Sequence, residues 1–134
     1  MKTQNRYEIA LRSDYPEWWR YNVFITVACY DANGEMTEYL NLTDKVYEVS
    51  ADNRFTNPPA DYDPQRPLRI ATPPTSHIET YIYIIANTFP LSDEIRLSPP
   101  FAVRLTVDRN GETIIDSSHE VNQWGGLTLK QSIE

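Results

Sequence analysis

Residues 21–35 read YNVFITVACYDANGE, and this stretch decides the fold class. Its apolar residues alternate at a period of two, which is typical of a β-strand with one face in a core. The predicted inner face consists of Val23, Ile25, Val27 and Cys29. The segment Asp31-Ala32-Asn33-Gly34-Glu35 then predicts a hairpin, because Asp caps a type I turn and Gly adopts positive φ without steric cost.

The same alternation recurs along the rest of the chain, over residues 7–11, 78–86, 101–107 and 127–129. A second turn, Asp108-Arg109-Asn110-Gly111-Glu112, repeats the D-x-N-G letters of the first, so we expect the same turn type. No window has the apolar spacing of an amphipathic helix. We therefore predict an all-β, two-sheet antiparallel β-sandwich of seven or eight strands. Ig-like, C2-like and jelly-roll topologies are not distinguished, and an up-and-down barrel is the alternative.

The length of 134 residues predicts one domain, residues 1–134, large enough to be held by burial alone. Cys29 is the only cysteine, so no intramolecular disulfide forms, and its phase with the inner face predicts an inert core residue. The N-terminus has no apolar region of a signal peptide, and no apolar run approaches the length of a membrane span. We expect a soluble protein, cytoplasmic as synthesised, that a particle then incorporates.

Residues 53–75 form the least strand-like segment, called the arm below. They contain Pro58, Pro59, Pro64, Pro67, Pro73 and Pro74, six of the ten prolines in the chain. Proline cannot donate to a ladder, so a central strand is excluded, and only Leu68-Arg69-Ile70 is expected to form a short strand. We predict an ordered, extended arm that crosses a sheet edge. Its predicted interface residues are Arg54, Phe55, Tyr62, Arg66 and Arg69.

Catalytic and metal-binding patterns are weak in this sequence. His77 and His119 lack the short spacing of zinc ligands, and the D-x-N-G turns lack the later acidic ligands of a calcium loop. Asp61 and Asp63 are the best carboxylate pair, although solvated loop acids are commoner. In Ser117-Ser118-His119-Glu120, neighbouring side chains point to opposite faces of a strand. We expect no enzyme activity, no cofactor and no metal.

Charge and aromatic content favour a protein partner. The net charge of −7 opposes nucleic-acid binding, and Tyr, Trp and Arg are enriched in interfaces. We predict a structural or accessory subunit of a large assembly, such as a virion or injection apparatus. Its partners would be other protein subunits, as multiple copies or as a hetero-assembly, with no membrane insertion. The alternative is a carbohydrate-binding module that uses exposed rings, namely Trp18, Trp19, Tyr21, Tyr81 and Tyr83.

Overall fold

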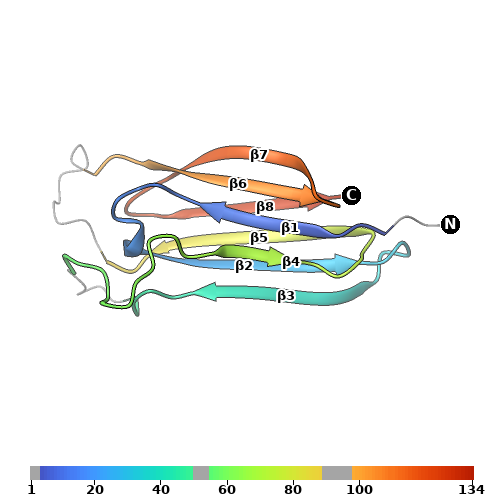
Figure 1. The fold of residues 1–134 in the computed structure, drawn as a ribbon, viewed down its shortest axis with the longest axis horizontal. Coiled ribbons are helices and arrows are strands. Elements are labelled where there is room, and N and C mark those ends of the chain that lie inside the picture. Colours follow the sequence, from blue (N-terminus) through green and yellow to red (C-terminus); the bar gives the residue numbers. More distant parts are fainter. Residues whose placement is uncertain (1–3, 50–54, 89–97) are drawn as a thin grey trace.

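The chain forms two antiparallel four-stranded sheets packed face to face (Figure 1). The structure is a computed structural model that describes residues 4–49, 55–88 and 98–134. One sheet has the strand order β4-β1-β6-β7 and the other β3-β2-β5-β8. The elements are β1 (Tyr7–Arg12), the 3-10 turn η1 (Trp18–Arg20), β2 (Tyr21–Tyr30), β3 (Met36–Asp44), β4 (Leu68–Ala71), β5 (His77–Ala86), β6 (Phe101–Arg109), β7 (Glu112–Val121) and β8 (Leu127–Ile133). The predicted β-sandwich is confirmed. Within these described ranges, no helix is long and apolar enough to cross a membrane.

The core lies between the sheets, and it consists of the alternate residues that the sequence pattern assigned to the inner faces. In β2 the alternate residues Val23, Ile25, Val27 and Cys29 have no exposed surface. The inward residues of β5 and β6 are buried in the same way, namely Ile78, Thr80, Ile82, Ile84, Val103, Leu105 and Val107. Each such strand therefore presents its other set of side chains on an outer face of the sandwich.

The two D-x-N-G hairpins have different turns. In the first, Gly34 has a φ of 82°, and Asp31 Oδ1 accepts the backbone N–H of Asn33 and of Glu35, as expected for a type I turn followed by a left-handed Gly. In the second, Asn110 (φ 53°) and Gly111 (φ 85°) are both left-handed, which defines a type I′ turn. The prediction of one shared turn type is therefore wrong for the second hairpin.

The arm lies where the chain crosses from the edge strand β3 of one sheet to the edge strand β4 of the other, and it includes β4 (Figure 1). The expected short strand is β4, which pairs with β1 from Glu8↔Ala71 to Leu11↔Leu68. After β4, Thr75 exchanges backbone hydrogen bonds with Asn5, at 2.8 and 2.9 Å. The described end of the arm is thus a sheet edge rather than a free loop.

Candidate binding surfaces

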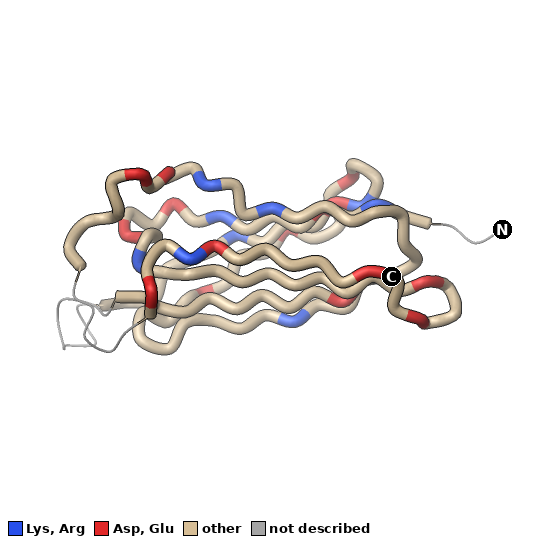
Figure 2. Tube along the Cα trace, turned by 90° about the horizontal axis from the view of Figure 1, so that it is seen from below, with Lys and Arg blue, Asp and Glu red and all other residues tan. Residues whose placement is uncertain are grey.

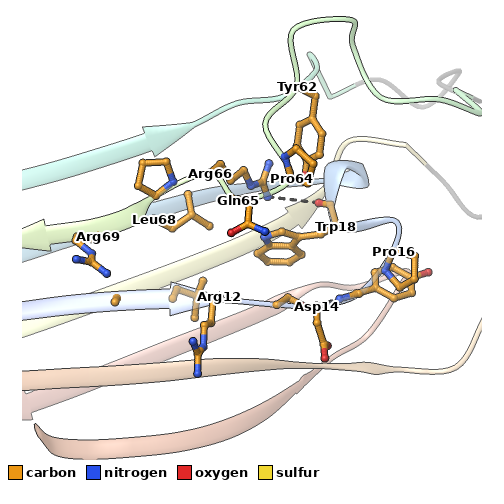
Figure 3. A pocket seen from close by; sticks show the side chains of 15 residues that line it. Arg12, Asp14, Pro16, Trp18, Tyr62, Pro64, Gln65, Arg66, Leu68 and Arg69 are labelled. Atoms are coloured by element: carbon orange, nitrogen blue, oxygen red, sulfur yellow. Dashed lines mark hydrogen bonds between the residues drawn. The ribbon is translucent and has the colours of Figure 1, made fainter.

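Arg66 ties the arm to its own chain (Figure 3). Its guanidinium lies 5.0 Å from the centre of the Trp18 ring and 5.5 Å from that of Tyr62, and its Nη1 forms an ion pair with Asp44 Oδ2 at 2.8 Å. Its Nη2 donates to the carbonyl oxygens of Trp18 and Tyr21, at 3.4 and 3.2 Å. Burial lowers the pKa of Arg66, and Asp44 opposes that shift. Arg66 and Tyr62 are therefore engaged within the molecule.

Phe55 and Arg69, two of the other predicted arm residues, have partners of their own. Phe55 stacks on Tyr47 with ring centres 4.0 Å apart and is 39% exposed. Arg69 is on the outer face of β4, where it forms an ion pair with Glu8 at 3.2 Å. Arg54 lies outside the described residues. Of the four described residues, Tyr62, Arg66 and Arg69 line one groove, and Phe55 is not among its lining residues.

Three of the five rings assigned to glycan binding belong to the interior. Trp18 and Trp19 are 4% exposed and Tyr21 is 1% exposed. Trp18, Tyr21 and Tyr15 surround Phe101, with ring centres 4.1 to 5.8 Å from it. Burial raises the pKa of Tyr15 to about 12 and raises that of Tyr21 further. Buried rings cannot stack on a sugar, so this part of the hypothesis needs correction, and only Tyr81 and Tyr83 remain from the set.

A groove of about 580 Å³ separates the arm from the segment that follows β1 (Figure 3). Its lining includes Arg12, Asp14, Trp18, Tyr62, Arg66 and Arg69. The charged residues of the lining are three Arg and one Asp, but Arg66 and Arg69 already have carboxylate partners, and the other two, Arg12 and Asp14, are of opposite sign. This composition selects no particular ligand charge.

The outer surface of the β3-β2-β5-β8 sheet is rich in exposed aromatic residues. Cross-strand pairing places Ala28 between Tyr39 and Glu79, Thr26 between Asn41 and Tyr81, and Phe24 between Thr43 and Tyr83. We call this surface the aromatic face; it comprises Phe24, Thr26, Ala28, Tyr30, Met36, Tyr39, Glu79, Tyr81, Tyr83 and Lys130. Tyr39 is 58%, Met36 55%, Tyr81 45% and Tyr83 36% exposed.

A shallow hollow of about 220 Å³ lies on the aromatic face. Its central strand contributes the small residues Thr26 and Ala28, and Tyr39 and Tyr81 stand on the flanking strands. Glu79 and Lys130 are at one side, and the Tyr30 hydroxyl donates to Glu79 Oε2 at 3.2 Å. The hollow exists because small side chains alternate with large ones across neighbouring strands.

The opposite outer face, on the β4-β1-β6-β7 sheet, is charged instead. Arg104 Nε donates to Asp116 Oδ1 at 2.7 Å, and this hydrogen bond lowers the pKa of Asp116. Arg12 pairs across the ladder with Arg104, and Arg69 is paired with Glu8. Figure 2 shows the two layers edge-on, with Lys and Arg more frequent in the upper layer, which contains the N-terminal strand. The aromatic face is thus the less charged of the two faces.

The titratable candidates form no catalytic constellation in the described residues. Ser117 and His119 share one face of β7, with Ser117 Oγ and His119 Nε2 2.8 Å apart, a contact that the sequence argument about neighbouring residues overlooked. Cys29 is buried, and burial raises its pKa. Asp63 accepts the backbone N–H of Gln65 in a turn. Among the described residues, no group of three His, Cys, Asp or Glu could hold a metal ion.

Comparisons with known proteins add little to this description. No family model matches the chain, and no curated protein matches it. Among solved structures, the chain is similar to the crystal structure of a DUF4425 family protein from Bacteroides ovatus, with a TM-score of 0.45 and 9% identity. That likeness covers 99% of this chain and 94% of the other. A likeness at this level assigns no function.

Proposed function

We propose that this protein is a non-enzymatic structural or accessory subunit of a larger protein assembly, such as a virion or an injection apparatus. We further propose that the aromatic face is its contact surface. The observation that carries the proposal is that Tyr39 of β3 and Tyr81 and Tyr83 of β5 share one outer face, on either side of β2, and are each 36% to 58% exposed. Contiguous exposed apolar surface on a small domain marks an interaction site, and Tyr, Phe and Met are enriched at protein interfaces.

The residues on this face suit a protein interface energetically. Tyr side chains supply large contact area at a low cost in rotamer entropy, because only two χ angles are fixed. Tyr81 and Tyr83 extend from β5, which is paired on both sides, and Tyr39 extends from the edge strand β3, which is paired with β2 along its length, so the backbone beneath them is held in the sheet. Little ordering entropy would then be lost on association.

The test is incorporation into the native complex. We would substitute Tyr39→Ser, Tyr81→Ser and Tyr83→Ser together, tag the chain, and measure its recovery in the complex purified from the source. We expect loss of incorporation with a cooperative melt retained. The matched control is Arg12→Ser with Glu120→Ser, two exposed residues of the opposite face, which should incorporate normally. Normal incorporation of the triple Tyr variant would refute the aromatic face as the contact surface.

A carbohydrate-binding module is the second candidate, and the hollow favours it. Tyr39 and Tyr81 flank the hollow, and Glu79 and Lys130 supply hydrogen-bonding groups at its side. Calorimetric titration with a panel of neutral oligosaccharides tests this function. Binding that Tyr39→Ala and Tyr81→Ala both abolish supports it, whereas absence of binding across the panel, or binding that both variants retain, counts against it.

A further inference from the structure

We infer that the occupant of the aromatic face is a second copy of this chain. The two copies pack face to face about a two-fold axis, with Glu79 of each copy against Lys130 of the other. This inference rests on the proposed function and names the partner of the same surface. It is carried by the placement of charge on the face and by the fit between one large side chain and the hollow.

Charge directs two copies toward this face. The chain carries a net charge of −7, so two copies repel each other over most of their surfaces. Among the outward positions of β3, β2, β5 and β8, the formal charges are those of Glu79 and Lys130, one of each sign. The aromatic face is therefore neutral, and it can approach its own copy without net repulsion.

The positions of these two charges are self-complementary. Glu79 pairs across the ladder with Ser132, and Tyr81 pairs with Lys130, so Glu79 and Lys130 lie on a diagonal between β5 and β8. In an isologous interface each contact occurs twice, because residue i of one copy meets residue j of the other and the reverse. A two-fold axis that lies in the interface plane and crosses this diagonal at its midpoint, at right angles, places each Glu79 against Lys130 of the second copy.

The same axis fits a bulky side chain to the hollow. Strands lie about 4.8 Å apart and rise about 3.3 Å per residue. With this spacing, the same axis determines which residues of the second copy lie opposite each of the remaining residues of the face. Tyr83 falls over the hollow of the second copy, between its Tyr39 and the small residues Thr26 and Ala28. Tyr81 falls close to Tyr81 of the second copy, near the axis. One operation thus satisfies both the charges and the shape.

The test uses charge reversal on the full chain, with mass measured by light scattering after size exclusion over a concentration series. The wild type should show twice the 15.6 kDa of one chain at high concentration. Because like charges then face each other twice, Glu79→Lys and Lys130→Glu should each raise the dissociation constant by a factor of about 100 or more. Mixing the two variants should restore a dimer, since each mixed pair contains two opposite-charge contacts. The double variant Glu79→Lys/Lys130→Glu should also dimerise.

The matched control is Glu120→Lys, an exposed acid of the opposite face, which should leave the dimer intact. A wild type that remains a monomer at all concentrations overturns the inference, as does a mixture of the two single variants that fails to dimerise. Equal weakening by Glu120→Lys also overturns it, because the loss would then not depend on the aromatic face. If the wild type is monomeric yet the triple Tyr variant fails to incorporate, a different protein covers the face; the inference falls and the proposed function stands. Monomeric wild type that binds oligosaccharides removes both.

Discussion

The arm and the aromatic face both contain aromatic residues, yet they place these side chains in opposite directions. In the arm, Tyr62 and Arg66 turn inward onto Trp18 and Asp44. On the aromatic face, Tyr39, Tyr81 and Tyr83 point outward from strands whose other side chains fill the core. Composition alone does not distinguish these two outcomes. The parity of a residue within its strand does, because it fixes which face the side chain joins.

The arm can turn inward because it crosses from one sheet to the other. Where β3 ends, Asp44 is 29% exposed at the side chain, and the arm brings Arg66 to it with its guanidinium over the Trp18 ring. Long cationic side chains cover apolar surface in this way. An arm that closes the end of its own sandwich leaves less of its surface for a partner.

The largest expected effect on the free energy of unfolding is at a core-facing residue of β5, and it contrasts with that at the next residue along the strand, which faces solvent. Ile82→Ala should reduce the free energy of unfolding by about 2–5 kcal/mol, because it leaves a cavity at a fully buried position. Tyr81→Ala, on the neighbouring residue, should cost less than about 1 kcal/mol, since its side chain is 45% exposed. Denaturant melts of both variants make the measurement. Equal losses would show that the aromatic face supports the core rather than remaining free for binding.

Removal of the arm's anchor should have the next largest effect. Arg66→Ala deletes the buried ion pair with Asp44 and the contact with Trp18, and because Asp44 keeps some solvent exposure the expected cost is about 2 kcal/mol. The control is Arg69→Ala, which removes a surface ion pair and should cost less than about 1 kcal/mol. If the two variants melt alike in denaturant, the arm is not held as described.

Alkaline pH should weaken the aromatic cluster around Phe101. Burial raises the pKa of Tyr15 from 10.0 to about 12, so its contribution to stability is complete below pH 10 and is lost as the pH rises toward 12. The raised pKa of Tyr21 acts in the same direction. Unfolding followed by circular dichroism across this range should show the loss, and Tyr15→Phe should reduce its steepness. An unchanged profile in Tyr15→Phe would exclude Tyr15 as a contributor.

The strand parity, and hence most of the fold, could be predicted from residues such as Val23, Ile25 and Val27, because one buried face imposes a period of two. Tyr39 was missed, although it alternates with Leu40 and Leu42, which pair with inward residues of β2. The contacts of Arg66 could not be predicted, because Asp44 and Trp18 are 22 and 48 residues away in the sequence. Only the crossing between sheets brings them together.

The second hairpin shows how a distant segment changes a local pattern. Asn110 donates its backbone N–H to Arg6 O at 2.8 Å, and its Oδ1 accepts the Arg6 N–H at 2.9 Å. In the first hairpin, the N–H of Asn33 bonds to Asp31 Oδ1 within its own turn. Pairing with the chain before β1 thus holds Asn110 in the left-handed region. Identical turn letters gave different turns for that reason.

The smallest expected effects on stability come from replacing one exposed ring in each region, Phe55 in the arm and Tyr39 on the aromatic face. Phe55→Ser removes the stack on Tyr47 and should cost about 1 kcal/mol, whereas Tyr39→Ser, 58% exposed, should change the free energy of unfolding by less than about 0.5 kcal/mol. Their effects on self-association should have the reverse order. Tyr39 walls the hollow that receives Tyr83 of the second copy, so Tyr39→Ser should weaken the dimer measurably, and Phe55→Ser should leave it unchanged. Melting and light scattering on the same two samples decide the matter. A dimer weakened by Phe55→Ser alone would show that the arm forms the interface, as the sequence analysis predicted, and that the aromatic face does not.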